Sequence, residues 1–212
     1  MTKFTTECRR CERLATFLDE VRAKYPDYFA KPVPSFGDPQ ARLLVVGLAP
    51  GMHGANATGR PFTGDHAGVL LYETLHQFGF ASQAEALAAD DGLELLDCRI
   101  TNAVRCLPPQ NKPIGSEINT CNDFLKTELE SLAPGAIILV LGGVAHRAVL
   151  KALSLRQADY KFAHGAEFAL PGDLRLISSY HCSRYNTQTR RLTPTMFADV
   201  FRAARDYLDA AA

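Results

Sequence analysis

Three side chains with complementary chemistry lie in polar loops of this 212-residue sequence: the carboxylate of Asp65, the amide of Asn102 and the imidazole of His181. A carboxylate can stabilise a cation or orient water. An imidazole can donate to an oxygen that gains negative charge, or act as an acid. A side-chain amide offers a donor and an acceptor side by side, as the Watson–Crick edge of a pyrimidine does. A fixed amide can therefore discriminate between pyrimidines, whose donor and acceptor patterns differ.

Each of these residues also has a structural interpretation. Asp65 precedes a predicted helix over 66–78, so its carboxylate can cap that helix by accepting from backbone N–H groups. A helix N-terminus favours the ionised form, so we expect Asp65 to stabilise a cation or orient water rather than act as a strong general base. Asn102 can satisfy the backbone of a turn. Phe62, in the same loop as Asp65, can stack on a planar base or anchor the loop to the core.

The loop that contains Asp65 is unusually rich in glycine. It reads GLAPGMHGANATGRPFTGD over residues 47–65 and holds five glycines, which let the backbone approach a ligand closely. It contains neither the G-x-G-x-x-G dinucleotide fingerprint nor the Gly-Lys-Ser/Thr ending of a P-loop. The loop therefore matches neither of these nucleotide-binding motifs.

Apolar runs of strand length alternate with segments of helical periodicity. Strands are predicted over 41–47, 94–104 and 136–142, with two more within 168–180 around a Pro171-Gly172-Asp173 turn. Helices are predicted over 7–24, 66–78, 116–132 and 143–153, with a last helix opened by Thr193 as N-cap and Pro194.

This alternation predicts an α/β fold with a largely parallel sheet covered on both faces. Open α/β sheets bind ligands beyond the carboxyl ends of their strands. The loops that hold Asp65, Asn102 and His181 each follow a predicted strand, so we expect these side chains to meet at that edge.

Six cysteines occur in a chain with no visible export signal, which favours metal or catalytic use over disulfides. Cys8 and Cys11 form a C-x-x-C pair that can reach one centre, and Cys106 and Cys121 could complete a four-thiolate site. The spacing accepts either Zn²⁺ or an iron–sulfur cluster, and ordinary free thiols are an alternative. Cys98 lies in an apolar run and is interpreted as a core residue.

The formal net charge is zero, with 23 basic and 23 acidic residues. Regions 39–64, 98–116 and 174–198 nevertheless hold nine basic residues and no acidic one. This distribution predicts a basic face at the strand ends and an acidic body elsewhere. A basic face is what binding to nucleic-acid phosphates needs.

The first residues contain no apolar signal-peptide segment, and no run approaches the length of a membrane span. We therefore expect a cytoplasmic protein that does not use a membrane. We also expect a monomer.

Three long motifs carry a resemblance to a known family: GLAPGMHGANATGRPFTGD (47–65), TNAVRCLPPQNKP (101–113) and SYHCSRYNTQTRRLTP (179–194). They resemble the family 5, or type B, uracil-DNA glycosylases of the uracil-DNA glycosylase superfamily. The resemblance implies a three-layer α/β/α sandwich around a central, mostly parallel four-stranded sheet. It also implies a single domain over 1–212, whose N-terminal segment an iron–sulfur cluster ties in.

The resemblance further implies a DNA repair enzyme that hydrolyses the N-glycosidic bond of uracil, and of other deaminated bases such as hypoxanthine, in DNA. It assigns catalysis to Asp65, His181 and Asn102, and a [4Fe–4S] cluster to Cys8, Cys11, Cys106 and Cys121. Substrate contacts fall at Gly47, Ala49, His53, Gly54, Phe62, Asn102 and His181. DNA contacts fall at Arg60, Ser183, Arg184, Tyr185 and Asn186.

Two other classes share these features. A non-catalytic module that binds damaged DNA or a nucleotide would keep the fold and the loops but tolerate loss of Asp65. An α/β enzyme stapled by zinc would act on free nucleotides.

The chain departs from the family pattern at two places. Gly51 and Met52 stand where type B members commonly have two alanines. Cys182 stands where the second motif usually has proline, which frees a backbone φ angle and an N–H group. We interpret Cys182 as a variant position and not as a nucleophile.

Overall fold

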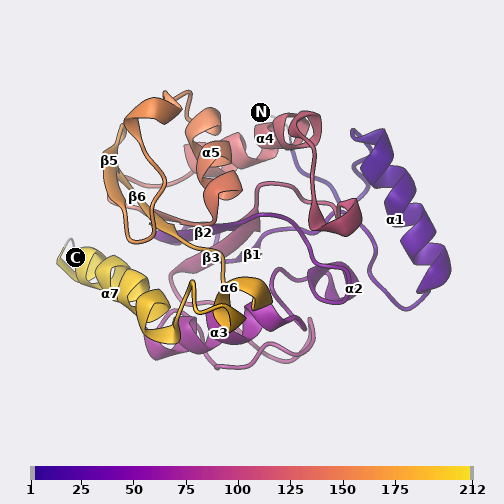
Figure 1. Cartoon of the computed structure of the whole chain (residues 1–212), viewed down its shortest axis with the longest axis horizontal. Coiled ribbons are helices and arrows are strands. Elements are labelled where there is room, and N and C mark those ends of the chain that lie inside the picture. Colours follow the sequence, from indigo (N-terminus) through magenta and orange to yellow (C-terminus); the bar gives the residue numbers. More distant parts are fainter. Residues whose placement is uncertain (1–2, 211–212) are drawn as a thin grey trace.

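The computed structural model describes residues 3–210 and contains one six-stranded sheet in the order β1-β3-β2-β4-β6-β5 (Figure 1). Its strands are β1 (Phe36–Gly37), β2 (Leu43–Gly47), β3 (Cys98–Asn102), β4 (Ile137–Leu141), β5 (Glu167–Leu170) and β6 (Leu174–Ser179). The four inner strands are parallel, while β1 and β5 pair antiparallel at the two edges. The predicted parallel four-stranded sheet is confirmed, and two short edge strands extend it.

Helices cover both faces of this sheet. They are α1 (Glu12–Lys24), α2 (Ala55–Thr58), α3 (His66–Gln77), α4 (Gly115–Glu130), α5 (Gly143–Ala152), α6 (Arg184–Gln188) and α7 (Pro194–Ala210), with short 3-10 turns η1 (Pro109–Asn111) and η2 (Gln157–Asp159). In Figure 1, α4 and α5 lie above the sheet and α3 and α7 below it. Within the described part of the chain, no helix has the length and apolarity that crossing a membrane requires.

Side-chain alternation along the strands explains the two layers of helices. On β2, Leu43 and Val45 join the core cluster that includes α3 and α7, while Leu44 and Val46 join the cluster under α4 and α5. Successive strand residues point to opposite faces, so a strand covered on both faces reads as a continuous apolar run. All five residues of β2 are buried, as the sequence predicted for 41–47.

The predicted helices differ from the observed ones mainly at their ends and in the polar loops. Helix α1 begins at Glu12 rather than at residue 7, so Cys8 and Cys11 precede it. Thr193 caps α7 as predicted, because its Oγ1 accepts from the Met196 N–H at 3.2 Å. The short helices α2 and α6 lie inside segments that were predicted as loops.

The register of the parallel strands sets which residues meet at the carboxyl edge. Gly47, the last residue of β2, pairs with Asn102, the last residue of β3. On the other side of β4, Leu141 pairs with Ser179, two residues before His181. The predicted meeting of the three loops at one edge is therefore confirmed.

A buried carboxylate fixes the segment around Asn102 to α4. Glu128 accepts from Thr101 Oγ1 at 2.7 Å, from the Arg105 guanidinium at 2.5 Å and from Ser35 Oγ. Burial raises the pKa of Glu128, but Arg105 and the two hydroxyl groups outweigh it, so the pKa lies below its ordinary value. Arg105 is only 3% exposed, so its charge depends on this partner.

We predict that Glu128→Gln lowers the free energy of unfolding at pH 7 by about 3–5 kcal/mol, because it leaves the buried Arg105 charge uncompensated. Denaturant unfolding measures the loss. The control is Glu130→Gln, which removes an exposed pair with Lys126 on the same helix and should cost about 0.5 kcal/mol or less. Equal losses in the two variants would contradict the buried-charge explanation.

Candidate active site

A pocket of about 690 Å³ lies at the carboxyl edge of the sheet, between the loops that follow β2, β3, β4 and β6. All three predicted catalytic residues, Asp65, Asn102 and His181, line it. Of the other predicted contacts, Ala49, His53, Gly54, Phe62, Ser183 and Arg184 line it as well, whereas Gly47, Arg60, Tyr185 and Asn186 do not.

Asp65 caps helix α3 at the pocket wall. Its Oδ1 accepts from the Gly68 N–H at 2.8 Å. Burial raises the pKa of Asp65 above its ordinary value, although the Gly68 and Ala67 N–H groups act in the opposite direction. We expected the helix N-terminus to favour the ionised form; here desolvation is the larger effect, so the carboxylate is a stronger base than the sequence indicated.

Gly54 allows the Asp65 carboxylate to reach the backbone of the glycine-rich loop. A Cβ atom built on Gly54 would lie 2.5 Å from Asp65 Oδ2, which no real side chain tolerates. The sequence suggested that glycine gives a ligand access to the backbone. At this position the absence of a side chain on glycine leaves room for the Asp65 side chain instead.

Asn102 has an unpartnered amide oxygen. The residue is 3% exposed, and its Oδ1 finds no hydrogen-bond partner among residues 3–210. Leaving a buried acceptor unpaired is costly, which points to a ligand that donates to it. Gly47 is again the reason the amide fits, because a Cβ there would lie 2.4 Å from Asn102 Oδ1 and 2.6 Å from the Phe62 ring.

Phe62 and His181 form one wall of the pocket. Their rings stack with centroids 5.9 Å apart and planes inclined by 29°. Phe62 has a left-handed φ of 55°, a strained backbone conformation for a bulky residue. Phe62 is 7% exposed and belongs to the core cluster as well as to the pocket. The interpretation of Phe62 as an anchor of the loop is therefore confirmed, while stacking on a base stays a prediction.

His181 is a neutral imidazole. Burial lowers its pKa to about 4, although part of the residue faces the open pocket. Its Nδ1 has no partner in the described part of the chain. The amide of Asn186 donates to the His181 carbonyl oxygen at 2.8 Å and so holds the loop in place. A neutral imidazole can donate one hydrogen bond but cannot act as a cationic acid near pH 7.

Cys182, which replaces the usual proline, packs into the core. It is fully buried in the cluster beneath the sheet, among residues of α3 and α7. Burial raises the pKa of its thiol, so the thiol stays protonated. This placement agrees with the interpretation of Cys182 as a variant position.

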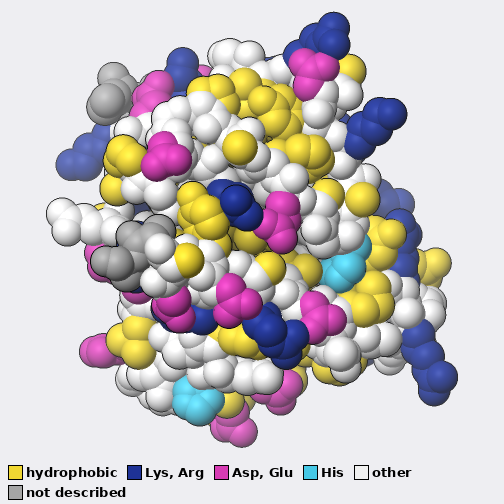
Figure 2. Space-filling view, turned by 90° about the vertical axis from the view of Figure 1, so that its left-hand side faces the viewer, with side chains coloured by type: hydrophobic (Ala, Val, Ile, Leu, Met, Phe, Trp, Pro, Cys, Tyr) yellow, Lys and Arg dark blue, Asp and Glu magenta, His cyan; other side chains and the backbone are white. Residues whose placement is uncertain are grey.

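Ion pairs reduce the predicted basic face. Five of the nine basic residues in the three loop regions form ion pairs with acidic residues from other segments: Arg42, Arg60, Arg99, Arg105 and Arg175. Lys112, Arg184, Arg190 and Arg191 form no ion pair within residues 3–210. Figure 2 shows a face on which acidic and basic side chains are interspersed, so the expected acidic body is not a separate surface there either.

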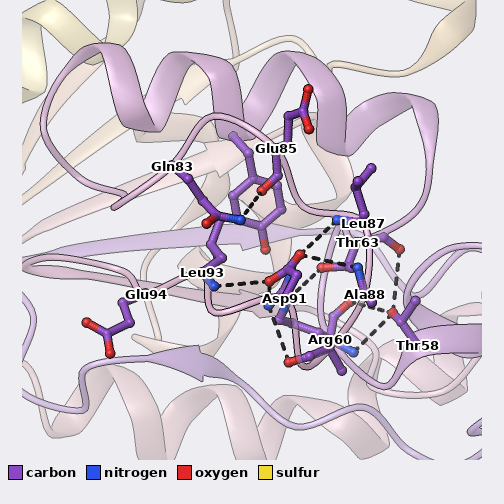
Figure 3. Close-up of polar contacts among 12 residues, drawn as sticks. Thr58, Arg60, Thr63, Gln83, Glu85, Leu87, Ala88, Asp91, Leu93 and Glu94 are labelled. Carbon is purple, nitrogen blue, oxygen red and sulfur yellow. Dashed lines mark hydrogen bonds and ion pairs between the residues drawn. The ribbon is translucent and has the colours of Figure 1, made fainter.

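Arg60 shows why the number of basic residues in the loop regions does not predict a basic surface. It was predicted to contact DNA, but it is 4% exposed and forms a bidentate pair with Asp91 (Figure 3). A guanidinium enclosed in this way cannot reach a phosphate on the protein surface. The prediction of Arg60 as a DNA contact is therefore corrected.

Several pocket residues were not singled out in the sequence. Asn111 lines the pocket and has a left-handed φ of 56°. Gly142, which follows the buried strand β4, lines it as well. His66 connects two elements across the rim, because its Nε2 lies 3.0 Å from Thr187 Oγ1 on α6. The signal for Asn111 was available, since it lies in a polar loop between prolines that follows β3.

The four predicted cysteine ligands converge at a separate place. Cys8, Cys11, Cys106 and Cys121 all line one cavity of about 20 Å³. The Arg105 backbone N–H lies 3.3 Å from Cys121 Sγ. In the described residues, the structure contains no group of three or more His, Cys, Asp or Glu side chains arranged to hold a metal ion. The cysteines of the described chain are free thiols.

Comparisons with known proteins place this chain in a family. The family model of the uracil DNA glycosylase superfamily matches residues 34–205. The chain is 46% identical over 205 residues to the type-5 uracil-DNA glycosylase of Thermus thermophilus, covering 94% of this chain and 93% of that one. It is 41% identical over 201 residues to the type-5 enzyme of Pyrobaculum aerophilum, covering 93% and 87% of the two chains.

A solved structure supports the fold. The crystal structure of Pedobacter heparinus SMUG2 superposes with a TM-score of 0.52 at 16% identity, covering 99% of this chain and 94% of that one. The same α/β architecture thus persists where the sequences have diverged widely. From the family model and the type-5 relatives together, the chain belongs to the uracil-DNA glycosylase superfamily, within the type-5 family.

Proposed function

We propose that this protein excises uracil from DNA by hydrolysing the bond between the base and the deoxyribose, as the first step of repair. The observation that carries the proposal is the unpartnered Asn102 amide oxygen, which shares one pocket with Asp65, His181 and Phe62. A base reaches such a pocket only when its nucleotide is rotated out of the duplex.

Recognition of uracil follows from the hydrogen bonds left open in the pocket. The N3–H of uracil is a donor that suits the Asn102 Oδ1, and the adjacent amide NH₂ suits the O4 acceptor. Cytosine presents the reversed pattern to the same edge. Phe62 supplies an apolar ring against which the base can stack.

Charge separation in the bond-breaking step defines the roles of Asp65 and His181. The deoxyribose gains positive charge, and the Asp65 carboxylate stabilises it or orients the attacking water. The base gains negative charge, which the neutral His181 imidazole stabilises by donating a hydrogen bond. The raised pKa of Asp65 makes its carboxylate a better acceptor for a water proton than an ordinary aspartate.

The rim of the pocket offers groups for the DNA backbone. Ser183 and Arg184 line it, and Tyr185 is 70% exposed beside them. A volume of about 690 Å³ is large for a pyrimidine alone. We therefore include other deaminated bases, such as hypoxanthine, among the substrates.

A non-catalytic module on the same fold is not favoured. Such a module needs no carboxylate next to the base. The Asp65 carboxylate, in contrast, packs against Gly54 and caps the N-terminus of α3 in the pocket wall. An enzyme of free nucleotides is equally disfavoured, because the type-5 relatives are named as DNA glycosylases.

We also propose that Cys8, Cys11, Cys106 and Cys121 hold a structural [4Fe–4S] cluster. Four sulfurs that line one cavity, with a backbone N–H directed at one of them, fit a four-thiolate group. The group would join the segment before α1 to α4 and to the loop after Asn102. Cys106 lies four residues beyond Asn102, so a group bound to Cys106 would also hold the Asn102 loop in place. We therefore assign it a structural role.

Replacing the carboxylate tests the catalytic assignment. Asn caps a helix as well as Asp does, so Asp65→Asn should fold normally. We expect its single-turnover rate on a uracil-containing oligonucleotide to fall by about 10²–10³-fold. Asp206→Asn, an exposed acid on α7, is the matched control and should retain the parent rate. Excision by Asp65→Asn at the parent rate would remove Asp65 from the mechanism.

The pH dependence tests the state of His181. Because its pKa is lowered to about 4, the imidazole stays neutral down to mildly acidic pH. We expect the single-turnover rate constant to be constant between pH 6 and 8. The rate should then fall on further acidification, as the Asp65 carboxylate takes up a proton at a pH above the usual range for aspartate. A titration near pH 6.5 that disappears in His181→Gln would contradict a buried neutral imidazole.

Metal analysis tests the cluster. Protein purified without air should show broad visible absorption and about four iron and four sulfide per chain. Cys106→Ser should lose both, while Cys98→Ala, which alters a core cysteine away from the cavity, should keep them. Zinc in place of iron would reject the cluster, and a folded, active protein without either metal would reject the metal site.

A further inference from the structure

Asp91 is the centre of a polar network that lies outside the pocket (Figure 3). Its two carboxylate oxygens accept from the Arg60 guanidinium at 2.8 and 2.7 Å. They also accept from the backbone N–H groups of Leu87, Ala88 and Leu93 at 2.9, 3.2 and 3.1 Å. Five donors thus converge on one carboxylate and fix the loop 86–93 to Arg60.

The pair is shielded from solvent, with the Arg60 side chain 5% and the Asp91 side chain 14% exposed. The Arg60 guanidinium holds the pKa of Asp91 well below its usual range, so both partners stay charged. An ion pair in such surroundings is a rigid connection rather than a fluctuating surface contact.

The network continues from Arg60 into the turn that carries the pocket residues. Arg60 Nε donates to Thr63 Oγ1 at 2.8 Å, and Thr63 is fully buried. On the far side of the turn, the Gly64 N–H donates to the Ala86 carbonyl at 3.1 Å. The turn 60–65 is therefore bonded to the loop 86–93 at both of its ends.

This turn needs external support. Phe62 and Gly64 both have left-handed φ angles, of 55° and 78°. A non-glycine residue keeps such a conformation only where its surroundings impose it. Contact with α3 is equally tight, since a Cβ on Gly68 would lie 1.7 Å from the Phe62 carbonyl oxygen. The turn ends at Asp65 and directs the Phe62 ring onto His181.

We propose that Asp91 is a positioning residue for base excision: through Arg60 it holds the turn 60–65 so that Phe62 and Asp65 face the flipped base. Neither Asp91 nor Arg60 lines the pocket, so both act through the residues of the turn. The inference rests on the proposed function only where activity is measured, since that measurement requires uracil excision. The restraint of the turn can be measured without substrate.

The test compares Asp91→Asn with the parent protein. We expect kcat for uracil excision from an oligonucleotide to fall by about 10–100-fold, because a displaced Asp65 loses its alignment. KM should change less than kcat. Amide hydrogen exchange over residues 60–66 should become faster. The acid limb of the rate profile should move to lower pH as water reaches Asp65.

Asp97→Asn is the matched control. Asp97 accepts from the Arg42 backbone N–H and side chain, both at 2.8 Å, at the opposite end of β2. It resembles Asp91 in joining one arginine to a loop but lies away from the pocket. At a temperature well below both unfolding transitions, Asp97→Asn should keep the parent kcat and the parent exchange over 60–66.

Two results would overturn the proposal. In the first, Asp91→Asn keeps the kcat and the amide exchange of the parent protein. In the second, Asp91→Asn and Asp97→Asn lose activity only in proportion to their loss of stability. If Asp91→Asn does not fold, Thr63→Val replaces it, because that change keeps the ion pair and removes its link to the turn, together with the bond from Thr63 Oγ1 to the Pro61 carbonyl oxygen. Thr63→Val must then show the lower kcat and the faster exchange, and without them the proposal fails. A parent protein that leaves uracil in DNA would refute the proposed function, while the exchange measurements would still decide the restraint.

Discussion

Gly47 has no side chain, and two walls of the pocket occupy the space that a Cβ atom would fill. Asn102 Oδ1 and the Phe62 ring both lie within 3 Å of that position. Because β2 and β3 are in parallel register, Gly47 and Asn102 are forced to be neighbours. The last residue of one strand therefore determines whether the last residue of the next can present its amide to the pocket. Gly54 likewise leaves room for Asp65, because a Cβ atom on Gly54 would overlap the Asp65 side chain. Gly47 and Gly54 therefore determine where the side chains of the pocket can lie.

Burial then acts on the two ionisable groups of the pocket in opposite senses. It raises the pKa of Asp65 and lowers that of His181, because desolvation penalises the charged form of each. The histidine is consequently a neutral donor at physiological pH. The Asp65 carboxylate holds a proton more readily than a solvated aspartate does. In the proposed mechanism, the neutral His181 faces the nucleobase that gains negative charge and the Asp65 carboxylate faces the sugar that gains positive charge, so one physical cause acts on both groups.

The sequence predicted the strands, the parallel sheet and the meeting of three loops, because apolar periodicity and loop composition are local properties. It did not predict the ionic environment. Arg60 pairs with an acid 31 residues away, and Arg105 with one 23 residues away, so counting charges within a loop region missed their partners. The raised pKa of Asp65 was missed for a related reason: capping is visible in the sequence, but the extent of desolvation depends on the packed loop. Helices α2 and α6 are four and five residues long, too short to show a helical period.

The residues around Asn102 show how helix α4 supports the site. Thr101 and Arg105, on either side of it, both donate to Glu128 of α4. The Arg105 backbone N–H is directed at Cys121 on the same helix, and Cys106 follows at once. Arg105 therefore belongs to two restraints, one through its side chain and one through its backbone. A displacement of α4 would move the Glu128 network and the cysteine cavity together. Since Asn102 lies within four residues of both, the position of its amide depends on α4, although α4 contributes no residue to the pocket.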